Sequence, residues 1–181
     1  MSDKIYIFDT TLRDGAQTQG VDFSLDDKEK ISVALDNLGV DYIEGGWPGA
    51  NPTDTEFFNK KHTFNNSILT SFWMTKKSDY SAENDPMISS LINSKANSIC
   101  LFGKSWDFHV DVALGISKEQ NLKNISESAK HIINSGKEFM FDAEHFFDGY
   151  KSNKEYALSC IKSAYDQGAR WIVLCDTNGG T

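Results

Sequence analysis

The sequence DTTLRDGAQ, at residues 9–17, directly follows a short apolar run, IYIF at residues 5–8. The apolar run predicts a short buried strand. Behind it, Asp14 offers hard carboxylate oxygens of the kind that bind divalent cations, and Arg13 offers a planar fork of donors for an oxyanion. Gly15 allows a sharp turn beside them. The stretch predicts a strand that ends in a binding site, although an Arg–Asp pair that only closes the strand explains the spacing equally well.

The segment that follows this stretch predicts an amphipathic helix. Ser24 is predicted to begin it, with Asp27 close to a capping-box position, and Gly39 is predicted to end it. The apolar stripe of this helix is predicted at Ile31, Ala34, Leu35 and Leu38.

The rest of the chain continues this alternation of strand and helix. Further helices are predicted from Pro52, from Pro86, and over 118–135 and 153–167. Strands are predicted at 5–8, 40–44, 67–73, 98–102, 138–141 and 170–175. Near-continuous apolar strands between helices are typical of an α/β protein with a parallel sheet.

Doubly wound sheets and barrels both alternate strand and helix, and the positions of the polar residues help to choose between them. Functional-looking side chains follow almost every predicted strand, the third being the exception, and a barrel gathers all its strand ends at one mouth. No GxGxxG motif or P-loop follows the first strand, which disfavours a nucleotide-binding doubly wound sheet. We therefore predict a (β/α)8 TIM barrel.

The chain is short for that fold. It has 181 residues, whereas a complete barrel has eight strands and about 250 residues. We expect residues 1–181 to form an incomplete catalytic barrel of about six β/α units, whose open edges would leave apolar faces exposed. The alternative is a self-contained sheet that protects its own edges.

Composition restricts the class of protein. The net charge is −8, from 26 acidic and 18 basic residues, which disfavours nucleic-acid and anionic-membrane partners. No apolar run is long enough to span a membrane, and the N-terminus lacks a signal-peptide core. The three cysteines form no CxxC pair, so we expect reduced thiols in a cytoplasmic protein.

Five motifs carry a resemblance to a known family. DTTLRDG at 9–15 resembles the signature of the metal-dependent Claisen-condensing enzymes on a TIM barrel, namely the isopropylmalate, homocitrate and citramalate synthases, with hydroxymethylglutaryl-CoA lyase as a cousin. The later motifs look most like the citramalate synthase branch; they are YIEGGWPG at 42–49, FGKSWDFH at 102–109, FDAEHFFDG at 141–149 and CDTNGG at 175–180.

The resemblance implies an acyltransferase that condenses acetyl-CoA with a 2-oxo acid, pyruvate in this branch, in branched-chain amino-acid biosynthesis. A divalent metal (Mg²⁺, Mn²⁺ or Zn²⁺) would polarise the oxo-acid carbonyl. Asp14 matches the family's aspartate ligand, and Arg13 matches its arginine, which is aimed at oxyanion charge. The remaining ligands in the family are a His-x-His pair on the seventh strand, which this chain lacks. One carboxylate does not hold a metal tightly, so we expect the isolated chain to be inactive; tight stoichiometric Mg²⁺ or Mn²⁺ binding would contradict this.

The resemblance also assigns residues beyond the first motif. Glu44 matches a catalytic strand-end glutamate that borders the metal and the enolate in related enzymes. The alternative is a carboxylate that pairs with Arg13, and the two roles are compatible. His109 falls where related synthases place a substrate-facing histidine, and a solvated loop histidine is the alternative. Thr177 matches a hydroxyl that binds the oxo-acid carboxylate, against a plain Asp–Thr–Asn turn. Gln17 is a further substrate-binding candidate.

Two more candidates follow the fifth predicted strand. Glu144 is a catalytic candidate and His145 a substrate-binding one, because either side chain could orient substrate or relay a proton. Three alternatives stay open: a 2-isopropylmalate or homocitrate synthase, a lyase that runs the retro-Claisen cleavage, and a non-catalytic remnant of a barrel. Family members are usually dimers, so the resemblance implies a homodimer.

Overall fold

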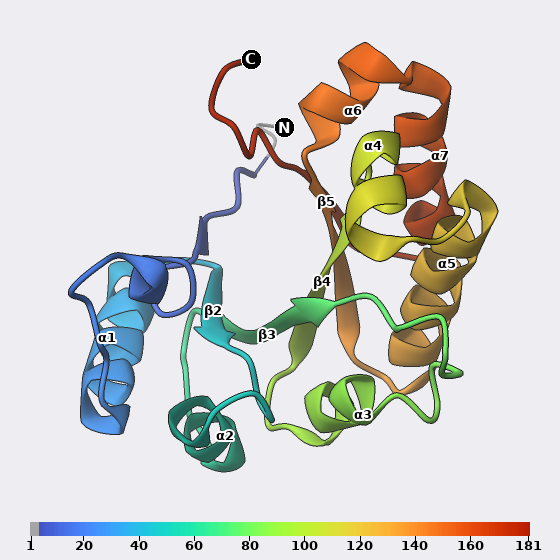
Figure 1. Cartoon of the computed structure of the whole chain (residues 1–181). Helices are drawn as coiled ribbons and strands as arrows, with labels where there is room; N and C mark the ends of the chain where they lie inside the picture. The colour runs from blue at the N-terminus through green and yellow to red at the C-terminus, as the bar shows by residue number, and fades with distance from the viewer. Residues whose placement is uncertain (1–3) are drawn as a thin grey trace. The chain divides into compact units, whose positions relative to one another are not determined.

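The computed structural model describes residues 4–181 and alternates strands with helices along the chain (Figure 1). The six strands are β1 (Phe8–Asp9), β2 (Tyr42–Gly46), β3 (Ile68–Met74), β4 (Ser98–Lys104), β5 (Glu138–Glu144) and β6 (Trp171–Leu174). They follow one another in the sheet in chain order, and the pairs β1–β2, β2–β3 and β5–β6 are parallel. This order and direction are those of the first six β/α units of a TIM barrel.

The helices lie between the strands in sequence. The longer ones are α1 (Leu25–Leu38), α2 (Pro52–Asn59), α3 (Pro86–Asn93), α5 (Lys118–Asn134) and α7 (Lys154–Tyr165). Shorter elements are the 3-10 turn Gly15–Gln17, α4 (Asp107–His109), which runs into a π-helical segment at Val110–Leu114, and α6 (Phe146–Ser152). The elements α4 and α6 were not predicted, because they lie in segments whose sequence favours strand-end loops.

The prediction of a buried strand over residues 5–8 was wrong. The strand begins only at Phe8, and the side chains of Ile5 and Ile7 are exposed. The carbonyl oxygen of Ile7 still accepts from the backbone nitrogens of Asp41 and Tyr42, both at 3.0 Å. β1 is the first strand in the sheet order, and an edge strand buries less of its apolar surface than a central one.

Contacts within the described residues divide the chain into two compact units. The first runs up to Phe72 and includes Asn93–Ser98, and the second comprises Trp73–Ile92 and Ile99–Thr181. Each unit has a core of its own.

In the first unit, the side chains that α1 buries most deeply are polar. Its start is the predicted capping box, in which the Ser24 hydroxyl accepts from the Asp27 backbone nitrogen and the Asp27 carboxylate accepts from Ser24, and Gly39 ends it in the left-handed region. The fully buried residues of α1 are Lys28, Ser32 and Asp36. Of the predicted stripe, Ile31 and Leu35 are half-buried, whereas Ala34 and Leu38 are exposed, Leu38 by 78%.

Apart from these polar residues of α1, the core of this unit is apolar. It is formed by Leu12, Val40, Ile43, Phe57, Phe58, Leu69 and Ala96. Asp36 fastens α1 to the segment before β3, because its carboxylate accepts from the backbone nitrogens of Asn65, Asn66 and Ser67 at 2.8–2.9 Å. Burial alone would raise the pKa of Asp36, but these hydrogen bonds hold the pKa of that carboxyl below its usual value.

In the second unit, the helices α5 and α7 pack against the strands. Their buried side chains include Ile125, Ala129, Ile132, Ala157 and Cys160. The short helix α6 approaches the end of β4 closely, since a Cβ atom on Gly149 would lie 2.4 Å from the carbonyl oxygen of Ser105. Only glycine permits that approach without displacing the backbone.

Candidate active site

The loop that follows β1 is wound tightly by its own backbone. The carbonyl oxygen of Thr10 accepts from the backbone nitrogens of Arg13, Asp14 and Gly15, at 3.2, 2.8 and 3.2 Å. The Asp9 carboxylate accepts from the backbone nitrogen and the hydroxyl of Thr11, at 3.0 and 3.1 Å. These local bonds set the direction in which the loop side chains leave the strand.

Arg13 is held on two sides. Its Nε donates to Glu44 Oε2 at 2.6 Å, and its guanidinium carbon lies 3.9 Å from the centre of the Phe72 ring. The Arg13 side chain is 14% exposed and the Glu44 side chain 1%. A charge-assisted hydrogen bond in a buried position, with an aromatic face beneath the guanidinium, fixes the orientation of the remaining donors. Glu44 is therefore paired with Arg13, and any catalytic role of Glu44 is exercised from within this pair.

The end of β2 is shaped to present Glu44. The β2–β3 register shifts between Glu44 and Gly46, which makes a β-bulge at Gly45. A Cβ atom on Gly45 would lie 2.8 Å from the Phe57 ring and 2.9 Å from the Phe58 ring. The glycine therefore lets α2 pack directly against the bulge.

Asp14 and Gln17 lie at the surface beside Arg13. The Asp14 side chain is 62% exposed and accepts from Arg13 Nη1 at 3.2 Å. Gln17 is exposed and lines, with Arg13 and Trp47, a cavity of about 330 Å³ within the first unit. The structure thus brings together four of the predicted residues, namely Arg13, Asp14, Gln17 and Glu44.

The second unit holds the other four predicted residues at the ends of its strands. Glu144, at the end of β5, forms an ion pair with Lys104 at the end of β4. The Glu144 carbonyl oxygen accepts from the Ser105 hydroxyl at 2.7 Å, which ties the two strand ends together. The pairing partner Lys104 lies inside the 102–109 motif.

His145 connects Glu144 to Thr177. His145 has φ 53° and ψ 36°, a left-handed conformation that is uncommon for a residue other than glycine. Its backbone nitrogen donates to Thr177 Oγ1 at 2.9 Å, and its Nδ1 lies 3.1 Å from Asp148 Oδ2. Strained residues of this kind persist where the surroundings fix them, often at functional sites. The Thr177 hydroxyl keeps its own proton to donate elsewhere.

His109 packs beside His145. The two imidazole rings meet edge to face with centroids 4.5 Å apart, and the Trp106 ring lies 4.7 Å from the His109 ring. Burial lowers the pKa of His109 below its ordinary value of 6.5, and the neighbouring His145 and Lys104 lower it further. The His109 side chain is half-buried against these rings, and its Nδ1 is buried without a hydrogen-bond partner.

Some residues of these clusters escaped sequence reasoning. Phe72 supports the Arg13 guanidinium from β3, the one strand that carried no polar signal at its end. Asp148 accepts from both His145 and Asn178. The spacing of Asp148 from His145, three residues on, was the available signal for that pair.

A metal site is not complete within the described residues. No three side chains from His, Cys, Asp and Glu gather there in a way that could hold an ion. Asp14 is an exposed carboxylate of suitable chemistry, but one such ligand does not make a site. Among residues 4–181, no helix is long and apolar enough to cross a membrane.

Comparison with known proteins places this arrangement in a family. The HMGL-like family model matches residues 4–181. The chain belongs to the HMGL-like family. A curated relative named (R)-citramalate synthase, from Aquifex aeolicus, is 52% identical over 183 residues that cover 100% of this chain and 35% of the relative. The (R)-citramalate synthase of Sulfolobus acidocaldarius is 49% identical over 98% of this chain and 34% of its own length.

Two more distant proteins are also similar to this chain, one in sequence and one in structure. A 2-isopropylmalate synthase from Sulfolobus acidocaldarius is 32% identical to this HMGL-like chain over 98% of it. The solved structure of hydroxymethylglutaryl-CoA lyase from Pseudomonas aeruginosa superimposes with a TM-score of 0.76 at 15% identity, covering 98% of this chain and 59% of the lyase. The TIM-barrel fold is thereby confirmed. The chain spans about a third of the length of the citramalate synthases that it matches.

Proposed function

We propose that the complete protein is an acyltransferase that condenses acetyl-CoA with pyruvate to form citramalate, in branched-chain amino-acid biosynthesis. The observation that carries this proposal is the preorganised Arg13, whose Nε donates to the buried Glu44 carboxylate at 2.6 Å. Identity of 42–52% to five proteins named (R)-citramalate synthase favours this branch over 2-isopropylmalate synthase, at 32–34%.

The chemistry needs one proton abstraction and one new carbon–carbon bond. A base takes a methyl proton from the acetyl thioester, the resulting carbanion attacks the ketone carbon, and the ketone oxygen gains a proton. Water then cleaves the thioester, which gives the second carboxylate of the product and free CoA. Negative charge on the ketone oxygen grows as the new bond forms, and a fixed guanidinium stabilises such charge most effectively.

The chain's own residues have separate parts in this proposal. Arg13 donates to the developing oxyanion, and the buried Glu44 holds its guanidinium in place. Glu144 with Lys104 serves proton transfer or substrate orientation, and His109, His145 and Thr177 contact substrate. Gln17 lines the cavity beside Arg13 and binds substrate there.

A divalent cation, Mg²⁺, Mn²⁺ or Zn²⁺, would supply polarisation of the oxo-acid carbonyl. Asp14 is the ligand that this chain would contribute, and further ligands must come from elsewhere in the complete protein. We also propose a homodimer and a cytoplasmic location, the latter supported by the three free cysteines.

The experiment is a substrate panel. The complete protein is incubated with acetyl-CoA and each of pyruvate, 2-oxoisovalerate and 2-oxoglutarate, and free CoA is followed with a thiol reagent. We expect kcat/KM for pyruvate to exceed that for the other acids by at least about tenfold, the discrimination expected of a site fitted to a methyl group. Preference for a branched or dicarboxylic oxo acid would move the assignment to the isopropylmalate or homocitrate synthases. Cleavage of an acyl-CoA without condensation would indicate a lyase, and no reaction with any acid would favour a non-catalytic remnant.

A further inference from the structure

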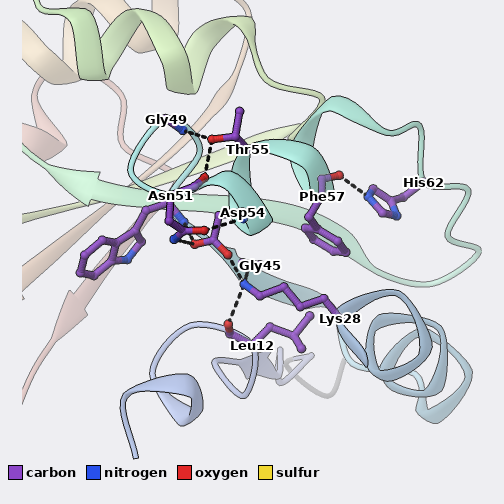
Figure 2. A network of polar contacts seen from close by, with 10 residues as sticks. Leu12, Lys28, Gly45, Gly49, Asn51, Asp54, Thr55, Phe57 and His62 are labelled. Atoms are coloured by element: carbon purple, nitrogen blue, oxygen red, sulfur yellow. Dashed lines mark hydrogen bonds and ion pairs between the residues drawn. The ribbon is translucent and has the colours of Figure 1, made fainter. Parts of the chain in front are cut away.

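A buried ion pair lies between α1 and α2 in the first unit. Lys28 is 4% exposed and Asp54 is 7% exposed, and the two side chains form a hydrogen-bonded ion pair. The Lys28 Nζ donates in addition to the carbonyl oxygens of Gly45, at 2.8 Å, and Leu12, at 3.1 Å. Figure 2 shows the ammonium among these three acceptors. An ammonium has three protons to donate, so Lys28 is fully satisfied by these partners.

Asp54 extends the same network to the segment after β2. Its Oδ2 accepts from the backbone nitrogen of Trp47 at 2.8 Å and from Asn51 Nδ2 at 3.0 Å (Figure 2). Asn51 in turn caps α2, since its side chain accepts from the Asp54 backbone nitrogen at 2.7 Å. A Cβ atom on Gly46 would lie 2.4 Å from Asp54 Oδ2. The carboxylate is therefore seated directly against the backbone that follows Glu44.

The two carbonyl groups that Lys28 binds have particular positions in the chain. Leu12 directly precedes Arg13, and Gly45 directly follows Glu44. One ammonium group thus fixes the backbone beside both members of the Arg13–Glu44 pair, of which Arg13 lies in the loop after β1 and Glu44 near the end of β2.

Stability alone does not account for this arrangement. Removing two charges from water costs several kcal/mol per ion, and apolar side chains of similar volume often stabilise a protein as well or better. The pair instead offers directed hydrogen bonds to backbone atoms, which apolar residues lack. We propose that Lys28 and Asp54 are positioning residues that hold the Arg13 loop and the Glu44 strand end in the geometry the reaction requires; as far as rate is concerned, this rests on the proposed function.

The test uses three variants of the complete protein. Lys28→Met removes the ammonium, and Lys28→Met with Asp54→Leu also removes the buried carboxylate that would be left unpaired. Lys30→Met is the matched control, because Lys30 lies on the same helix in an exposed pair with Asp26. We expect Lys28→Met to lower the melting temperature and to lower kcat by roughly a hundredfold, the effect of a small misplacement of a catalytic group. The KM for acetyl-CoA should stay within about twofold.

The double variant separates positioning from stability. We expect it to recover the melting temperature of the wild type while kcat remains at least about tenfold down. Recovery of both would show that the pair is only structural and would overturn the proposal. Lys30→Met should match the wild type in both measurements.

Hydrogen exchange supplies a readout that does not depend on the reaction, and Asp54→Asn is a milder variant for it. We expect amide exchange in peptides covering 10–17 and 44–48 to accelerate by at least about tenfold in Asp54→Asn, while α5 keeps its protection. Unchanged exchange in both peptides would overturn the proposal, whichever of the other variants folds. If Asp54→Asn shows this faster exchange but the wild type condenses acetyl-CoA with no oxo acid, the positioning inference stands and the proposed function fails.

Discussion

Arg13 and Asp14 are adjacent in sequence but differ in their surroundings. Arg13 is mostly covered and held by Glu44 and Phe72, whereas Asp14 is exposed. A covered, oriented guanidinium suits stabilisation of charge on a reacting atom, and an exposed carboxylate suits a ligand that approaches from solvent.

The difference gives a prediction for Asp14. In the complete protein, Asp14→Asn removes one charged ligand, so we expect the dissociation constant for Mn²⁺ to rise by roughly tenfold or more. Electron paramagnetic resonance of free Mn²⁺ during a titration measures this directly. Asp22→Asn is the control, because it removes another carboxylate of the first unit, one that lines the cavity beside Arg13. Equal Mn²⁺ affinity in the wild type and Asp14→Asn would remove Asp14 from the metal site.

His109 gives a prediction about pH. Burial, with His145 and Lys104 nearby, places its pKa in the folded protein below 6.5. Between that folded pKa and about 6.5, the unfolded chain binds more protons than the folded one, so stability must fall as the pH decreases through this window. Nuclear magnetic resonance of the imidazole protons in the complete protein should show His109 titrating below 6.5, with His109→Gln to assign the signal. Titration of His109 above 6.5 would contradict the burial described for it.

At the scale of elements, local signals predicted the starts of helices better than the faces that they bury. Ser24 and Pro52 mark the starts of α1 and α2 as their capping chemistry predicts. The predicted apolar stripe of α1 was right for Ile31 and Leu35, which pack against the core, and wrong for Ala34 and Leu38, which are exposed. The buried Lys28 and Asp36 were missed, because polar residues of this kind are usually found at the surface. Asp36 accepts from backbone nitrogens 29–31 residues away, and Lys28 pairs with Asp54, 26 residues away. No local pattern contains those pairings.

The same contrast applies to the site. The pairing of Arg13 with Glu44 was left open from the sequence, as the alternative to a site role for Glu44. Both residues stand at strand ends, and parallel strands bring such ends to one edge. The support from Phe72 and from the Lys28–Asp54 pair was not foreseen, since an aromatic residue within a strand and a helical lysine are ordinary core and surface signals. Contacts that position a site are thus harder to predict than the residues that form it.

Asp36 gives a prediction at this scale. Asp36→Asn removes the charge that three backbone amides approach, and we expect the free energy of unfolding to fall by about 2 kcal/mol. Because the folded pKa of Asp36 is depressed, its contribution is present above the unfolded value of 3.8 and is lost as the pH falls through the folded value. Urea unfolding at pH 7 and at lower pH measures both effects in the complete protein. Asp26→Asn, exposed in the first turn of α1, should change stability by less than about 0.5 kcal/mol; an equal loss in both variants would contradict the anchoring role of Asp36.

At the scale of the whole molecule, the sheet order and the family agree with a barrel. In the second unit, apolar side chains lie exposed beside β6. Leu158, Tyr165 and Leu174 are exposed and line, with Ile161 and Ile172, a groove of about 590 Å³ beside β6.

The central claim is that the strand-end arginine serves a carbon–carbon bond-forming reaction. The most direct test is product analysis by mass spectrometry after the complete protein has been incubated with acetyl-CoA and pyruvate labelled with ¹³C, for the wild type and for Arg13→Gln. We predict labelled citramalate in amounts equal to the CoA released by the wild type, and an initial rate roughly a hundred- to a thousandfold lower for Arg13→Gln. CoA release without labelled citramalate, or an undiminished rate in folded Arg13→Gln, would contradict the account.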